Sequence, residues 1–170
     1  DANGVRIRAI LDLIPYGEDW RRAGEYLKQV LGDIGIKLEL RYEDVPTWLK
    51  RIYHNYDFVM NVNYFYQLPD PVLGVHRHYG TDQIRKGTHF VNSSRYSNSE
   101  LDELLASGAT EANAQKRTQI YKKIQEILAR DMPVVNLFEL QFLTVYNTKL
   151  KGAYNSALGA YASFREAYLD

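Results

Sequence analysis

The sequence opens with a change of hydrophobic period that strongly limits the possible folds. Apolar and polar side chains alternate over residues 5–13, which is the pattern of a strand with one exposed face. Apolar side chains then recur at helical spacing over residues 20–34, and strict alternation returns over residues 36–42. A strand, a helix and a second strand in this order predict a β-α-β unit with a right-handed crossover.

The pattern continues with a short helix and a more apolar strand. Val45 and Pro46 open the helix, and an almost unbroken apolar run over residues 58–66 favours a strand that is buried on both faces. Pro71 suits the first turn of a further helix, since a proline there loses no helical hydrogen bond. Little periodicity is present in residues 79–95, and we expect a long loop there.

Two helices and a last strand-like stretch complete the expected domain. Ser97 and Glu100 have the spacing of a capping box before a helix that Gly108 would close. The longest helix follows and should stop at Pro133. We therefore predict one α/β domain over residues 1–170, with a mixed central sheet flanked by helices. Its strands are expected near residues 5–14, 36–43, 57–66 and 134–146, and the tail from Gly152 is expected to pack against something outside this sequence.

Composition excludes several classes of function. The 170 residues are 45% hydrophobic, enough for a core without disulfides or metal, and no apolar run approaches the length of a membrane span. The 21 basic and 21 acidic residues balance, so no bulk field attracts nucleic acid. Cysteine is absent, which excludes disulfides and thiolate chemistry. The chain does not begin with Met, and we expect a mature or excised segment.

Metal binding, cofactor binding and catalysis have little support in the motifs. His76 and His78 fall in a stretch that reads as helical, where positions two apart point in different directions, so we expect no metal site. No nucleotide-binding, hydrolase or zinc-protease motif occurs, and we expect no cofactor. An enzyme that uses His54, His76 or Glu139 in a cleft stays open as an alternative, because catalytic groups are defined in space. An interaction domain without a ligand is a third possibility.

A cluster of aromatic residues marks the candidate binding site. Tyrosine accounts for 14 of the 22 aromatic residues, and its flat face and hydroxyl suit polar ligands. The carboxyl end of a buried strand in an open α/β sheet is where ligands commonly bind. Strand alternation must turn some of these side chains toward the core, so we expect Gln67 and one or two of the three aromatics beside it to face a ligand. The candidate ligand-binding residues are Tyr64, Phe65, Tyr66 and Gln67, with Tyr16 at the end of the first strand.

Four stretches, taken in chain order, resemble a known family. They are residues 31–38, Asp70-Pro71, residues 95–105 and residues 117–133. This series is similar to the dipeptide/oligopeptide/nickel-type extracellular solute-binding proteins, family 5, of ATP-binding-cassette (ABC) importers. The resemblance implies a periplasmic-binding-protein-like fold and the C-terminal lobe of a two-lobed receptor. It further implies a periplasmic or extracytoplasmic location and no enzymatic activity.

The same resemblance implies partners for this chain and indicates which classes of ligand it favours. A peptide or small-molecule ligand would close between this lobe and an N-terminal lobe of the same protein, for delivery to a membrane permease of the importer. Dipeptide binders of the family carry an Asp at the position of Gln67 and an Arg at the position of Ile14. Without these charges the resemblance favours a longer peptide, a glycoside or another polar metabolite, and it leaves metal chelates open.

Overall fold

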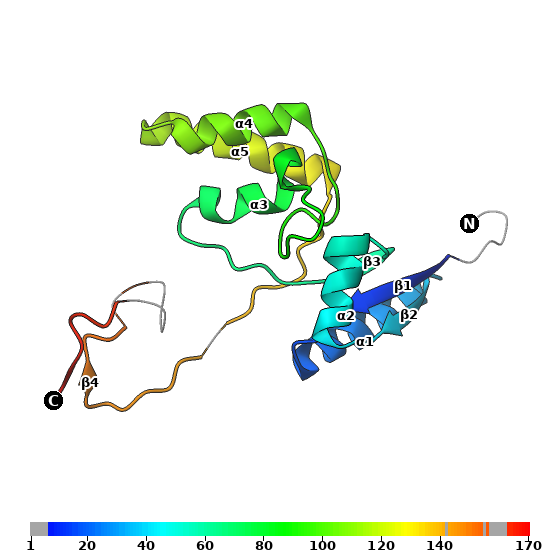
Figure 1. The fold of residues 1–170 in the computed structure, drawn as a ribbon, viewed down its shortest axis with the longest axis horizontal. Helices are drawn as coiled ribbons and strands as arrows, with labels where there is room; N and C mark the ends of the chain where they lie inside the picture. The colour runs from blue at the N-terminus through cyan, green and yellow to red at the C-terminus, as the bar shows by residue number, and fades with distance from the viewer. Residues whose placement is uncertain (1–6, 142, 155, 157–162) are drawn as a thin grey trace. The chain divides into compact units, whose positions relative to one another are not determined.

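The computed structural model describes residues 7–141, 143–154, 156 and 163–170. The chain divides into two compact units, residues 1–133 and 134–170, and each is described by itself (Figure 1). The expectation of one domain over residues 1–170 stays a prediction. No helix in the described ranges is long and apolar enough to cross a membrane.

The first unit is built around a small parallel sheet. Its strands are β1 (Arg8–Leu13), β2 (Lys37–Arg41) and β3 (Met60–Val62), and they lie in the order β2-β1-β3. Helix α1 (Glu18–Asp33) joins β1 to the parallel strand β2, as Figure 1 shows. This confirms the predicted β-α-β arrangement and the α/β class. Residues 5 and 6 of the expected first strand lie outside the described residues.

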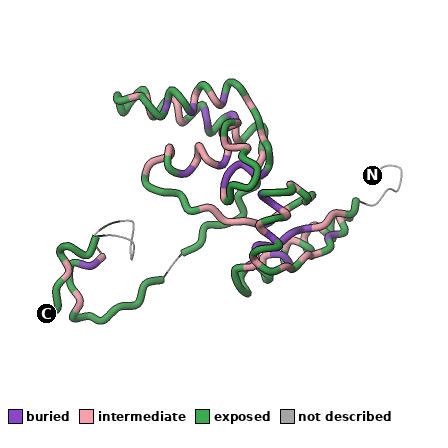
Figure 2. Tube along the Cα trace, viewed as in Figure 1, coloured by how far each residue is buried: buried purple, intermediate pink, exposed green. Residues whose placement is uncertain are grey.

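The core of the sheet region is rich in aromatic side chains. It is the largest group of buried residues, and it appears as the buried stretches along the sheet and the helices beside it in Figure 2. Helix α2 (Val45–Leu49) and the π-helix η1 (Lys50–Asn55) both contribute to it. Its members are Leu11, Leu13, Ile14, Trp20, Leu38, Trp48, Ile52, Tyr53, Val62 and Val91.

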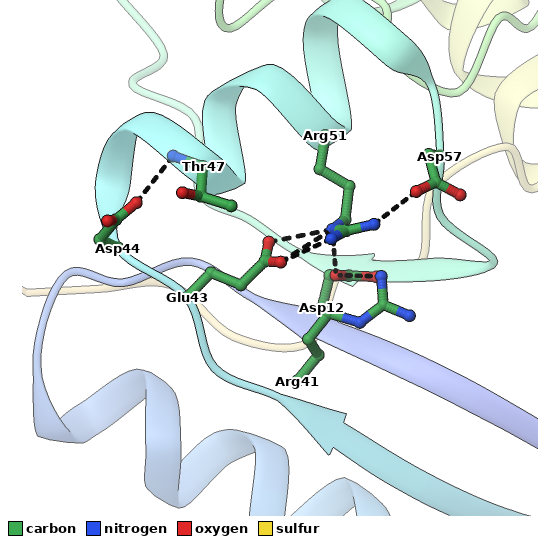
Figure 3. A network of polar contacts seen from close by, with 7 residues as sticks. All are labelled: Asp12, Arg41, Glu43, Asp44, Thr47, Arg51 and Asp57. Atoms are coloured by element: carbon green, nitrogen blue, oxygen red, sulfur yellow. Dashed lines mark hydrogen bonds and ion pairs between the residues drawn. The ribbon is translucent and has the colours of Figure 1, made fainter.

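A buried carboxylate connects the sheet to η1. Asp12 in β1 is 1% exposed, and its Oδ1 lies 3.4 Å from Nη1 of Arg41 and 3.7 Å from Nε of Arg51 (Figure 3). Arg51 also binds Glu43, at 2.7 Å, and Asp57. Burial raises the pKa of Asp12, and the two arginines act in the opposite direction. The network fixes η1 against β1, and this determines where the side chains of η1 point.

A helical region completes the first unit. It packs around a second, purely aliphatic group of buried residues, Leu101, Leu105, Ile124 and Ile127. Helices α4 (Ser99–Thr110) and α5 (Ala114–Asp131) supply this group and lie side by side (Figure 1). The helical elements are the 3₁₀-helix η2 (Pro71–Leu73), α3 (Val75–Tyr79), the 3₁₀-helix η3 (Thr81–Gln83), α4 (Ser99–Thr110) and α5 (Ala114–Asp131).

The predicted boundaries of α4 are wrong at both ends. Asn98 is the N-cap, because its side chain accepts the N–H of Leu101 at 3.0 Å, whereas Ser97 accepts a hydrogen bond from Thr81. Gly108 lies inside the helix. A Cβ at that position would approach the ring of Tyr121 to 3.1 Å, so this glycine permits close contact between α4 and α5 and does not end the helix.

The prediction of a long buried strand over residues 57–66 is also wrong in extent and burial. Only Met60–Val62 form β3, and Val62 is the sole buried residue of that range. The reason is the position of β3 at the edge of the sheet, with β1 as its only neighbour among the described strands. Val59 and Met60 are exposed there.

The fourth predicted strand, residues 134–146, does not form in the described residues of that range. A strand needs a neighbour for its backbone N–H and C=O groups, and this segment has none among the described residues of its own unit. The second unit instead contains a short antiparallel pair, β4 (Leu150–Lys151) with β5 (Tyr168–Leu169). An apolar, strand-like sequence therefore does not by itself produce pairing here.

Candidate functional site

The candidate site lies where β1 and β3 end. The two strands are parallel, with Leu13 opposite Val62, and the N–H of Ile14 donates to the carbonyl of Val62 at 3.1 Å. The segments that leave the two strands therefore start from the same edge of the sheet. This edge is the usual ligand-binding position in open α/β folds. It brings Tyr16, which follows β1, close to Tyr64, which follows β3.

Three aromatic rings meet at this edge. Tyr16 and Tyr64 are in edge-to-face contact with ring centroids 5.9 Å apart, and Tyr64 stacks on Trp20 at 5.5 Å. Tyr16 is 41% exposed, Tyr64 is partly buried and Trp20 is buried. We call Tyr16, Trp20 and Tyr64 the aromatic cluster. Sequence reasoning placed Trp20 only on the core face of a helix, although its position one turn into α1, just after β1, was a usable signal.

Tyr64 is positioned by polar contacts from η1. The side-chain amide of Asn63 donates to the hydroxyl of Tyr53 at 2.5 Å, and its oxygen accepts the N–H of Tyr64 at 2.9 Å. Tyr53 is fully buried, and burial raises its pKa to about 12, so its hydroxyl stays protonated at neutral pH. Because Arg51 anchors η1, the ion network of Figure 3 supports the aromatic cluster indirectly.

Phe65 and Gln67 turn toward helix α3. The amide nitrogen of Gln67 lies 3.2 Å from Nδ1 of His78, and the ring of Phe65 lies against the His78 ring. A Cβ added to Gly74 would collide with Oε1 of Gln67, so glycine at this position lets the side chain of Gln67 keep its place. Burial, with the charge of Arg77 as a smaller cause, lowers the pKa of His78 to about 3. His78 is therefore neutral and accepts the amide proton at Nδ1.

Tyr66 stands between these two groups in sequence. Its side chain is 39% exposed, and its carbonyl accepts a hydrogen bond from Nη2 of Arg77 at 2.8 Å. The sequence-predicted residues thus fall into two sets. Tyr16 and Tyr64 share the aromatic cluster, whereas Phe65 and Gln67 contact His78, a residue that sequence reasoning considered only as a metal ligand. Their role as a ligand-binding set stays a proposal.

Ile14 serves the core and not the surface. It is 1% exposed and also lines a hollow of about 440 Å³ at the carboxyl ends of β1 and β2. Arg21 and Tyr42 give this hollow a polar side, with the guanidinium of Arg21 4.9 Å from the Tyr42 ring centroid. The other lining residues are Leu13, Pro15, Gly17, Glu43, Asp44 and Val45.

The histidines form no metal-binding group in the described residues, where no set of three His, Cys, Asp or Glu side chains could hold an ion. Nε2 of His76 lies 3.1 Å from the hydroxyl of Tyr121, and Nδ1 of His54 lies 3.2 Å from Oδ1 of Asn55. Burial lowers the pKa of His76. Within the part of the chain that is described, neither histidine forms an ion pair with a carboxylate.

Comparison with known proteins gives a consistent set of relatives. No family model matches the sequence. The chain is 23% identical, over 143 residues, to the peptide transport periplasmic protein SapA of Haemophilus influenzae; the match covers 82% of this chain and 24% of SapA. AppA of Clostridium difficile matches 100% of this chain with 35% of its own length, at a TM-score of 0.79 and 24% identity, which shows the fold.

A third comparison links this fold to transport by name. The ABC transporter substrate-binding protein CtaP of Listeria monocytogenes is 27% identical and covers 76% of this chain with 26% of its own, at a TM-score of 0.64. The chain is related to the peptide-type solute-binding proteins of ABC importers. This confirms the resemblance carried by the four sequence stretches. The chain spans about a quarter to a third of the length of these relatives.

Proposed function

We propose that this chain is the C-terminal lobe of an extracytoplasmic solute-binding protein. The lobe captures a peptide or another small polar ligand together with an N-terminal lobe of the same protein, and the closed complex delivers the ligand to the membrane permease of an ABC importer. The observation that carries the proposal is the aromatic cluster, because it places a partly exposed stacking surface at the ligand-binding edge of a fold shared with CtaP. SapA, a peptide transport protein by name, supports the ligand class.

Binding, and not catalysis, is the role that these residues support. The work of such a lobe is hinge closure around a ligand. His54 and His76, the histidines considered for an enzyme, contact a neutral amide and a phenol. Glu139 belongs to the other compact unit. In these two contacts neither histidine is oriented by a carboxylate, the arrangement that general base catalysis commonly uses.

Calorimetry of the intact protein tests the proposal directly. Peptide and oligosaccharide libraries are titrated into it, and small molecules that copurify with it are identified by mass spectrometry. Tyr64→Ala should weaken ligand binding at least about tenfold, because it removes a stacking face. The matched control is Tyr26→Ala, which removes an exposed tyrosine from α1 and should leave the affinity unchanged. Absence of any ligand would favour an interaction domain, and turnover of a ligand would favour an enzyme.

A second measurement tests the two-lobe arrangement. Ligands that close between two lobes are desolvated by both, so the 170-residue chain alone should bind at least about a hundredfold more weakly than the intact protein. Micromolar or tighter binding by this chain alone would show a self-contained pocket and contradict the proposed division of the site between two lobes.

A further inference from the structure

Arg77 is a partly buried cation beside the candidate site. It lies on α3, and its Nη2 donates to the carbonyl of Tyr66 at 2.8 Å. Its Nε is inaccessible to solvent and has no hydrogen-bond acceptor among the described residues. The side chain as a whole is only half-buried. Partial burial of a charge is costly unless that charge is compensated.

In the other partly buried arginines that form ion pairs, carboxylates compensate the positive charge. Arg51 binds three carboxylates, Arg41 pairs with Asp12, and Arg117 binds Asp70 at 2.8 Å. Arg77 forms no ion pair within 4 Å in the described ranges. Its positive charge is therefore met by one backbone carbonyl, which supplies a partial negative charge only.

The surroundings of Arg77 belong to the candidate site. Nη2 of Arg77 donates to the carbonyl of Tyr66, one of the residues that the sequence predicted for this site. The neighbouring residue, His78, adds a second donor. Its Nδ1 accepts from Gln67, which leaves the proton on Nε2, and that buried atom also has no acceptor among the described residues. Two donors without acceptors among the described residues thus lie next to residues 65–67, and no acidic side chain in that part of the chain is paired with them.

We propose that Arg77 anchors a carboxylate group of the ligand. The inference rests on the proposed binding function and gives its ligand a charge. A guanidinium presents donors in a fork that matches a carboxylate, and the hydrogen bond to the carbonyl of Tyr66 holds that fork beside a residue of the candidate site. The carboxylate then supplies the counter-charge that the described residues do not. The side-chain amide of Gln67 is engaged by His78 and does not compete for the anion.

The test compares three peptide mixtures in the intact protein. All are random tetra- to hexapeptides: one with free carboxyl termini and no Asp or Glu, one with the same sequences as C-terminal amides, and one with amidated termini and a single Glu. The wild-type protein should bind the first or the third mixture at least about tenfold more tightly than the second, because one charge-assisted contact is lost in the second. Binding of the first alone assigns the anion to the peptide terminus, and binding of the third assigns it to a side chain.

Variants assign that preference to Arg77. Arg77→Gln should reduce the ratio of the affinities for carboxylate and amide ligands to about one without lowering the affinity for the amide ligands. Arg77→Lys should keep part of the preference for carboxylates. Arg22→Gln, which removes an exposed positive charge from α1, is the matched control and should keep the full preference. Equal binding of all three mixtures by the wild-type protein overturns the proposal for Arg77 and leaves the binding function intact. A preference that survives Arg77→Gln also overturns it, whereas failure of every mixture to bind contradicts peptide binding itself.

Discussion

Two segments of this protein are both rich in apolar residues and both predicted to be strands, but they have different environments. In β1, Leu11 and Leu13 are buried between α1 and the neighbouring strands. In residues 134–146, Leu143 is 91% exposed and Val145 is 95% exposed. The difference shows that an apolar, strand-like sequence records an extended preference, whereas burial requires a partner edge and a covering layer. Among the described residues of its own unit, the second segment has neither.

Hydrogen exchange should show the largest difference between the two segments. Backbone amides of β1 that are bonded to β2 or β3 should open only with free energies approaching that of global unfolding, about 5–15 kcal/mol. Amides of residues 134–146 in the 170-residue chain should exchange with free energies near zero. Comparable protection of both segments would show that residues 134–146 are also paired in solution. Protection that appears only when the proposed partner lobe is present would identify that lobe as the missing partner of this segment.

A matched pair of substitutions measures the same difference through side chains. Leu11→Ala removes a buried side chain from the sheet core and should lower the free energy of unfolding by about 2–5 kcal/mol. Leu143→Ala makes the same chemical change at an exposed position and should alter it by less than about 0.5 kcal/mol. Urea unfolding of both variants gives the two values. Similar losses at the two sites would mean that Leu143 is buried in solution.

Burial of His78 should also make the free energy of unfolding depend on pH. The pKa of His78 is lowered to about 3 from 6.5, so the unfolded chain binds a proton between these values while the folded protein does not. Stability is therefore full above about pH 6.5 and falls as the pH drops toward 3, by up to about 1.4 kcal/mol per pH unit. His78→Gln should remove this component in unfolding curves recorded from pH 7.5 to 4. An unchanged slope would show that His78 is solvated.

The smallest effect on stability is expected for an exposed cluster in the helical region, which consists of Tyr96, Arg130 and Asp131. Hydrogen bonds from Arg130 and then from the hydroxyl of Tyr96 lower the pKa of Asp131 to about 2. The associated stabilisation is present above pH 3.8 and is lost as the pH falls through 2. Tyr96→Phe should raise the Asp131 pKa toward 3.8 in an NMR titration. Tyr26→Phe, the same change on α1, should leave it near 2, and an unmoved value in Tyr96→Phe would exclude the contact.

Much of the candidate site could be predicted because it follows from strand ends. Tyr16 comes directly after the first predicted strand and Tyr64 lies near the end of the predicted strand over residues 57–66, and parallel neighbours place such residues at one edge. Trp20 and His78 could not be assigned in the same way. Trp20 has the helical spacing of an ordinary core residue, and the contact between His78 and Gln67 joins positions 11 residues apart through the path of a loop.

The sequence by itself determined the order of local elements, the β-α-β unit and the relation to solute-binding proteins, since periodicity and motifs are properties of neighbouring residues. The tertiary structure alone decided which apolar segments find a partner. The strand predicted over residues 57–66 was shortened to an edge strand, and the described residues of 134–146 stayed unpaired, because pairing depends on contacts with segments distant in sequence. It also decided that Arg77 has no acidic partner among the described residues while Arg51 has three, because ion pairing depends on distance in space and not along the chain.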